Sequence, residues 1–152
     1  MKKNTEKKKE PYPLKRKRFT LSEEEKSNIF TQLEELLKNE KRIQFAYLFG
    51  SFVEKLPFHD IDLSIWVNGL LDKDAISFSV ELSGRLTRQM NYPVDIRILN
   101  FAPVPFRFEV VRGKRIYVRD EQTHSEFLED TMRRYLDIQP ILYRATKEAF
   151  AE

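Results

Sequence analysis

The sequence predicts a single domain of the α/β or α+β class, in which helices cover one face of a small sheet. Short apolar runs of strand length alternate with longer segments of helical periodicity, as in layered domains. The 152 residues suffice for one ordinary domain and are too few for two. The chain has no cysteine, which excludes disulfides, thiolate zinc sites and cysteine nucleophiles. No apolar run approaches the roughly 18 residues that cross a bilayer, so we expect a cytoplasmic protein without membrane contact.

The positive charge of the chain is concentrated at its start. Residues 1–18 contain nine Lys or Arg and two Glu, whereas the remaining 134 residues contain 18 basic and 22 acidic side chains. Like charges and two prolines disfavour a compact structure there, so we predict a disordered basic tail over 1–18 and a single domain over 19–152. The tail is either a solubilising leader or a weak nucleic-acid contact, made through the phosphates.

The domain should begin with a helix that is followed by two strands. Ser22 and Glu25 have the spacing of a capping box, in which each side chain accepts from the other's backbone amide, so the helix should run from here to about Lys38. Residues 44–49 form a short apolar run that ends at a glycine, as expected for a buried strand. Every second residue of 61–67 is apolar, which predicts a strand with one buried face.

A second helix and a third strand follow. Residues 72–90 carry apolar side chains at near-helical spacing, and a proline precedes the apolar run of 94–99. Strand, helix and strand in this order favour a sheet with helices packed against it.

The C-terminal part contains one ambiguous segment. Residues 106–118 alternate at their start as a strand would, whereas Pro105 is equally suited to open a short helix. We expect a strand over 116–118. A long helix should follow Asp120, and Pro140 should kink or interrupt it.

Three carboxylates fall at positions that suit a metal site. In a strand, residues two apart share a face, so Asp60 and Asp62 should project side by side while their apolar neighbours enter the core. Asp95 lies likewise between two apolar residues of the next predicted strand. Adjacent carboxylates repel unless a cation lies between them, and oxygen ligands suit Mg²⁺ or Mn²⁺. Three of them can hold two metal ions, which is an arrangement used for displacement at phosphorus.

Gly50 and Ser51 supply a candidate phosphate site. A glycine at the end of a strand permits a tight turn and a close approach of the backbone to a ligand. Amides and a hydroxyl that follow such a turn can bind phosphate oxygens. The order Gly-Ser, Asp-Ile-Asp and, after a helix, Val-Asp-Ile is far more specific than any of its parts.

At these residues the chain resembles the minimal nucleotidyltransferases (MNT) of the DNA polymerase β superfamily, from about Gln44 to Leu99. The segment Arg112 to Tyr117 and the Tyr135-Leu136-Asp137 run resemble the branch that pairs with HEPN-domain proteins as toxin and antitoxin. The resemblance implies a small mixed sheet covered by helices, with a long C-terminal helix. It also implies that Gly50 and Ser51 bind the triphosphate, and that the carboxylates ligate two Mg²⁺ ions, namely Asp60, Asp62 and Asp95.

The implied function is transfer of AMP from ATP to a tyrosine hydroxyl of a HEPN toxin, with pyrophosphate released. Asp95 would also help to activate the hydroxyl. Two alternatives stay open: an antitoxin of this fold that has lost catalysis and acts by binding, and a nucleotidyltransferase that modifies RNA or a small molecule.

The loop between the Gly-Ser pair and the first carboxylate departs from the family pattern. Family members commonly have about ten residues here, often with Arg and Gly among them, whereas this chain has eight, residues 52–59, with neither. Lys55 is the one basic side chain of this loop, and it either contacts the triphosphate or is simply exposed to solvent. His59 is expected to be a hydrogen-bonded neighbour of the carboxylates rather than a ligand.

Overall fold

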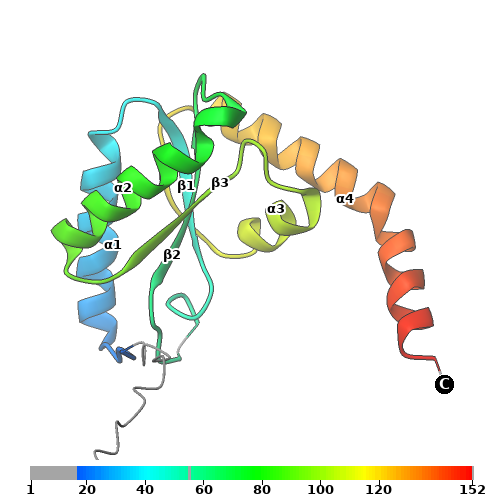
Figure 1. Cartoon of the computed structure of the whole chain (residues 1–152), viewed down its shortest axis with the longest axis horizontal. Coiled ribbons are helices and arrows are strands. Elements are labelled where there is room, and N and C mark those ends of the chain that lie inside the picture. Colours follow the sequence, from blue (N-terminus) through cyan, green and yellow to red (C-terminus); the bar gives the residue numbers. More distant parts are fainter. Residues whose placement is uncertain (1–16, 55, 152) are drawn as a thin grey trace, which may run out of the picture.

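A four-stranded mixed sheet, in the order β3-β2-β1-β4, is the framework of the molecule in this computed structural model, which describes residues 17–54 and 56–151 (Figure 1). Strand β1 pairs antiparallel with both β2 and β4, whereas β2 and β3 run parallel. The elements, in chain order, are α1 (Glu23–Lys38), β1 (Ile43–Phe49), β2 (Ile61–Val67), the short 3₁₀ helix η1 (Asp72–Asp74), α2 (Ala75–Met90), β3 (Val94–Ile98), α3 (Val104–Val111), β4 (Lys114–Val118) and α4 (Glu121–Ala149).

The predicted elements of the first two thirds are confirmed to within one or two residues. Helix α1 begins at the capping box: the Ser22 amide donates to Glu25 Oε2 at 2.7 Å and the Glu25 amide to Ser22 Oγ at 3.2 Å. Strand β2 has the predicted bounds, and the predicted helix at 72–90 forms as η1 followed by α2.

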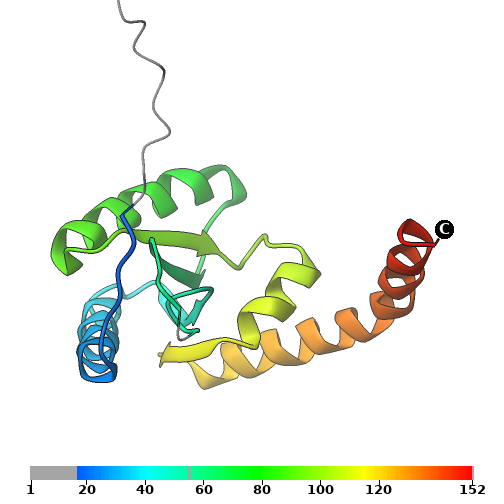
Figure 2. The same ribbon diagram turned by 90° about the horizontal axis from the view of Figure 1, so that it is seen from below.

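Helices cover both faces of the sheet, so the expectation of a single covered face is wrong. Figure 2 shows α1 and α2 on one side of the strands and α3 with α4 on the other. The larger core lies under α1 and α2 and includes Leu33 and Leu63. Strand β1 also presents large aromatic side chains to the opposite face, and α3 and the start of α4 bury them in a second core, formed by Phe45, Tyr47, Leu99, Val110 and Phe127.

The ambiguous segment forms a helix followed by a strand. Pro103 is the N-cap of α3 in an extended conformation, and Pro105 lies in its first turn, where a missing amide costs no hydrogen bond. Strand β4 then includes the predicted strand at 116–118.

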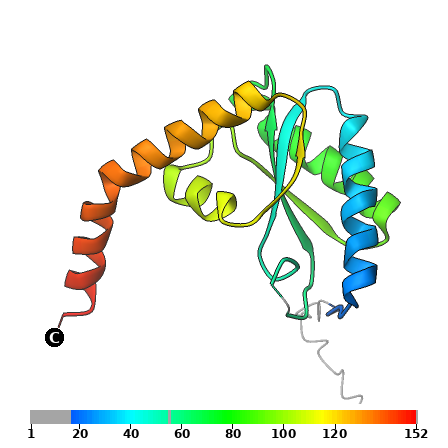
Figure 3. The ribbon, with the colours of Figure 1, turned by 180° about the vertical axis from the view of Figure 1, so that it is seen from behind.

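Helix α4 continues through Pro140 without interruption and changes direction in its C-terminal half (Figures 1 and 3). The second half points away from the sheet, and Tyr143 on this half is exposed. Over the residues that the structure describes, no helix is both long enough and apolar enough to span a membrane.

A buried Tyr-His pair makes the second core sensitive to pH. Tyr47 Oη lies 2.6 Å from His124 Nε2, and burial raises the pKa of Tyr47. Burial, and next the charge of Arg115, lowers the pKa of His124 below its ordinary 6.5, with a smaller opposing effect of Glu121. In the unfolded chain His124 gains its proton near its ordinary pKa, whereas in the folded chain it resists protonation.

We therefore expect this pair to stabilise the fold above about pH 6.5 and to lose that contribution as the pH falls through the lowered pKa of His124. His124→Phe should cost about 1–3 kcal/mol at pH 7.5, because it leaves the Tyr47 hydroxyl unsatisfied, and the variant should lose less stability on acidification. Urea unfolding of the wild-type protein and of His124→Phe, at pH 7.5 and at an acidic pH, measures both the loss of stability and its dependence on pH. The Tyr47→Phe/His124→Phe double variant is the control, and equal pH slopes in all three proteins would contradict the prediction.

Candidate active site

The three predicted carboxylates lie together at one edge of the sheet. Asp62 on β2 and Asp95 on β3 are directly paired in the parallel register, and Asp60 immediately precedes β2. All three line a polar cavity of about 570 Å³, together with residues from α2 and β3. The cavity exists because Ile61 and Leu63, between and beside the carboxylates, are fully buried on the opposite face.

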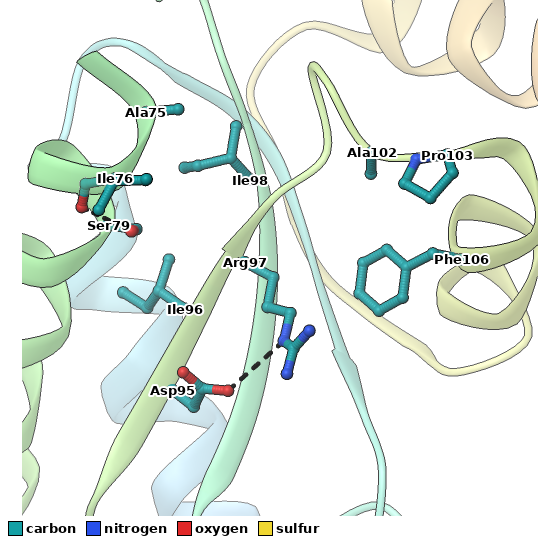
Figure 4. A pocket seen from close by; sticks show the side chains of 10 residues that line it. All are labelled: Ala75, Ile76, Ser79, Asp95, Ile96, Arg97, Ile98, Ala102, Pro103 and Phe106. Atoms are coloured by element: carbon teal, nitrogen blue, oxygen red, sulfur yellow. Dashed lines mark hydrogen bonds and ion pairs between the residues drawn. The ribbon is translucent and has the colours of Figure 1, made fainter. Parts of the chain in front are cut away.

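The cluster has an excess of negative charge. The pKa of Asp62 is raised from 3.8 to about 6, first by burial and then by the charges of Asp60 and Asp95, and Arg97 opposes this only in part. Arg97 Nε lies 3.6 Å from Asp95 Oδ2, and a dashed line marks this ion pair in Figure 4. The ion pair forms because Asp95 and Arg97 are two residues apart on β3 and therefore lie on the same face of the sheet. One partly exposed guanidinium cannot neutralise three carboxylates, so the cluster favours a further cation.

The donor set fits a hard divalent cation. Within 17–54 and 56–151, no group of three or more His, Asp or Glu side chains is already arranged to enclose a metal ion. The carboxylates nevertheless offer only oxygen atoms, which Mg²⁺ and Mn²⁺ prefer, and the raised pKa of Asp62 marks the place where positive charge is lacking. Asp60, Asp62 and Asp95 are therefore the residues that would hold such ions.

Gly50 lies against Asp62, one of these three carboxylates. It ends β1 with a φ of +76°, and a Cβ atom added to it would overlap Asp62 Oδ2. The amides of Val53 and Glu54 donate to the Gly50 carbonyl at 3.2 and 3.3 Å, which closes a tight turn that begins with Ser51. Of the two predicted phosphate-binding residues, Gly50 is thus beside Asp62, and Ser51 follows it in the turn. Lys55, the third, lies outside the described residues.

Arg112 is a basic residue near this turn that the sequence analysis did not assign to the site. It lines a cavity of about 360 Å³ together with Gly50 and Glu109, and its Nη1 lies 3.4 Å from Glu109 Oε1. The antiparallel pairing of β1 with β4 brings it here, because Leu48 pairs with Lys114. No local sequence signal marks this proximity; only the pairing of the strands does.

His59 makes hydrogen bonds to the chain that precedes α1. Its Nδ1 lies 3.3 Å from the Lys17 carbonyl, and its Nε2 accepts from Arg18 Nε at 3.4 Å. This pattern agrees with the expected role of a hydrogen-bonded neighbour. Of the predicted basic tail, 1–16 lie outside the described residues. Trp66 stacks on Phe45 and packs against the second core.

Comparison with known proteins identifies related sequences and folds. The model of a family described as "Polymerase beta, Nucleotidyltransferase" matches residues 31–122, a range that includes Gly50, Ser51 and the three carboxylates. No curated protein matches the chain at a significant level.

Three solved complexes contain chains of similar fold. The complex of a tri-AMPylated HEPN toxin from Shewanella oneidensis with its MNT antitoxin gives 23% identity and a TM-score of 0.65 over 83% of this chain and 99% of that one. A mutant of the toxin-antitoxin MntA-HpeT gives 25% identity and a TM-score of 0.65, over 82% of this chain and 98% of that one. A toxin-antitoxin crystal structure with AMP-PNP gives 24% identity and a TM-score of 0.66, over 80% of this chain and 98% of that one. The mixed sheet with a long C-terminal helix is therefore an arrangement found in MNT–HEPN complexes.

Proposed function

The chain belongs to the polymerase β nucleotidyltransferase family, and on that premise we propose that it transfers AMP from ATP to a tyrosine hydroxyl of a HEPN toxin and thereby acts as an antitoxin. The observation that carries the proposal is the direct pairing of Asp62 with Asp95 next to Asp60, in a cavity whose three carboxylates outnumber the one cationic side chain among its described lining residues, Arg97. The solved relatives support the acceptor and the donor, since one contains a tri-AMPylated HEPN toxin and another contains AMP-PNP.

The residues divide the work of a phosphoryl transfer. Asp60, Asp62 and Asp95 would hold two Mg²⁺ ions, or Mn²⁺, which would supply positive charge to neutralise the triphosphate. The backbone at Gly50 and the Ser51 amide and hydroxyl bind phosphate oxygens, and Lys55 is proposed to contact the same group. Asp95 takes up the proton of the attacking hydroxyl. A bond forms between that oxygen and the α-phosphorus, the bond to the β-phosphate oxygen breaks, and pyrophosphate leaves.

The C-terminal half of α4 offers a surface that a protein partner could bind. It projects from the domain (Figures 1 and 3) and carries exposed large apolar side chains, a feature typical of interaction surfaces. These residues are Leu136, Ile141, Leu142 and Tyr143. Of the basic tail considered above as a weak nucleic-acid contact, Arg18 lies in the described part, and its Nε donates to His59 Nε2 at 3.4 Å.

Mass spectrometry of the partner tests the proposal. A candidate HEPN-domain partner is incubated with this chain, ATP and Mg²⁺, and we expect mass gains of whole AMP units on a tyrosine. Removal of metal with EDTA should abolish the gain, as should an ATP analogue with a methylene bridge between the α- and β-phosphates. Neutralisation of the toxin without any mass gain would instead support the antitoxin that acts by binding alone.

A further inference from the structure

Strand β3 is an edge of the sheet, and the direction of its backbone groups can be derived from its hydrogen bonds. The Leu99 amide donates to the Ile65 carbonyl and the Ile61 amide to the Pro93 carbonyl, both at 2.8 Å. In a parallel pair, alternate residues direct both their N–H and C=O groups to the same neighbour. The odd-numbered residues of this strand therefore bond to β2, and Val94, Ile96 and Ile98 direct theirs outward.

The outward groups of Val94 are occupied by α2. The Val94 amide donates to Thr87 Oγ1 at 3.0 Å, and the Val94 carbonyl accepts from Ser83 Oγ. One turn earlier in α2, the Ser79 hydroxyl donates to the Ile76 carbonyl at 2.8 Å instead of to the strand. Consequently, nothing in the described part of the chain hydrogen-bonds the outward groups of Ile96 and Ile98.

A cavity of about 460 Å³ lies along this open edge (Figure 4). Ile76 from α2 and Phe106 from α3 belong to its two opposite walls, and Ile96 and Ile98 lie between them. The Ile76 side chain is 78% exposed although it lies on the predicted apolar stripe of its helix. Open sheet edges are normally covered or blocked by charge, so an apolar groove beside unpaired amides and carbonyls indicates a binding surface.

An extended polypeptide is the occupant that fits these groups. It would pair with the outward amides and carbonyls of Ile96 and Ile98, which have the spacing of alternate strand residues. The edge of a nucleobase would hydrogen-bond to only about two of these four groups. Asp95 and Arg97 line both this groove and the carboxylate cavity, so the groove continues to the reaction site. The guanidinium of Arg97 in turn complements an acidic side chain on the bound segment.

We propose that the outer edge of β3 receives an extended segment of the protein acceptor as an added strand, with the hydroxyl to be modified beside Asp95. Because side chains alternate along a strand, that hydroxyl points to the same face as Asp95 and Arg97, and its two neighbours point toward Ile76. The inference rests on the proposed AMP transfer and specifies how the acceptor is presented.

Amide exchange measured by NMR tests the added strand. The ¹⁵N-labelled chain alone should exchange the Ile96 and Ile98 amides faster than those of Arg97 and Leu99, which face β2. Saturation with the HEPN-domain protein should slow Ile96 and Ile98 by at least about 10-fold. Unchanged exchange of Ile96 and Ile98 in the saturated samples overturns the inference, whether or not AMP is transferred. Equal slowing by the methylene ATP analogue with Mg²⁺, in the absence of the partner, also overturns it, because the groove would then bind the adenine base. Slowing without any AMP transfer leaves the inference standing and refutes the proposed function.

A variant pair on α2 separates docking from chemistry. Ile76→Glu should raise the KM for the HEPN-domain protein by about 10-fold and leave kcat and the Kd for ATP unchanged. Ser77→Glu adds the same charge to an exposed neighbouring position of the helix and should change none of these constants. An unchanged KM in Ile76→Glu, or equal effects of the two variants, contradicts the groove as the acceptor site.

Discussion

Replacing Asp62 with Asn should reduce AMP transfer by at least about 100-fold and at the same time make the metal-free protein more stable. The loss of transfer follows from removing an oxygen that is proposed to bind metal, at the position where Asp62 pairs with Asp95. The gain in stability follows from the raised pKa of Asp62, which is about 6 in the folded chain against 3.8 in the unfolded one. Few changes at a merely structural residue would combine these effects.

The stability effect has a defined pH range. The pKa of Asp62 is higher in the folded chain than in the unfolded one. Asp62 therefore lowers the stability of the fold hardly at all below about pH 3.8, increasingly as the pH rises from there, and to the full extent above about pH 6. At pH 7.5 Asp62→Asn should therefore gain roughly 1–2 kcal/mol, after allowance for solvent screening at a half-buried carboxylate.

Urea unfolding in EDTA measures the stability of the metal-free protein, and the same experiment in Mg²⁺ measures the stabilisation by the metal. We expect Mg²⁺ to stabilise the wild-type protein and to have little effect on Asp62→Asn. The exposed Asp72 offers a matched control, and Asp72→Asn should leave transfer and the response to Mg²⁺ intact. Undiminished transfer by Asp62→Asn would refute the assigned role of this carboxylate.

A methyl group at Gly50 should have the second large effect, with transfer lowered about 100-fold and stability by about 1–3 kcal/mol. The added Cβ would overlap Asp62 Oδ2, and the φ of +76° disfavours any side chain. Gly50→Ala therefore both displaces the Asp62 carboxylate and strains the turn that is proposed to bind phosphate.

Two further variants separate these causes. Gly69 has a similar φ of +67° but no atom within 4 Å of an added Cβ, so Gly69→Ala should show the backbone strain alone, about 1 kcal/mol, with normal transfer. The double variant Gly50→Ala/Asp62→Ala lacks the carboxylate that the added Cβ would overlap. Its unfolding free energy should therefore be higher than the sum of the two single changes predicts, whereas AMP transfer should stay low. Strict additivity in the unfolding free energies would mean that Gly50 and Asp62 do not interact as described.

The location of Arg112 beside Gly50 and the open groove at β3 are features that sequence reasoning did not supply. Arg112 reaches Gly50 through the pairing of β4 with β1, which joins segments far apart in the chain. Ile76 lies on the helical stripe that predicts burial, yet the edge of β3 leaves it without a covering element. Periodicity identifies which face of a helix is apolar, but only the neighbouring elements decide whether that face is covered.

Short-range physical chemistry was sufficient for most of the elements and for the candidate residues. The capping box at Ser22, the alternation in β2 and the Asp-Ile-Asp spacing depend on a few adjacent residues, so the sequence by itself determined a helix, a strand and a pair of carboxylates on one face. The tertiary structure decided that Asp95 stands directly beside Asp62 and that the segment after Pro103 coils as α3. Both depend on which distant apolar surfaces are buried against each other, and a local pattern does not contain that information.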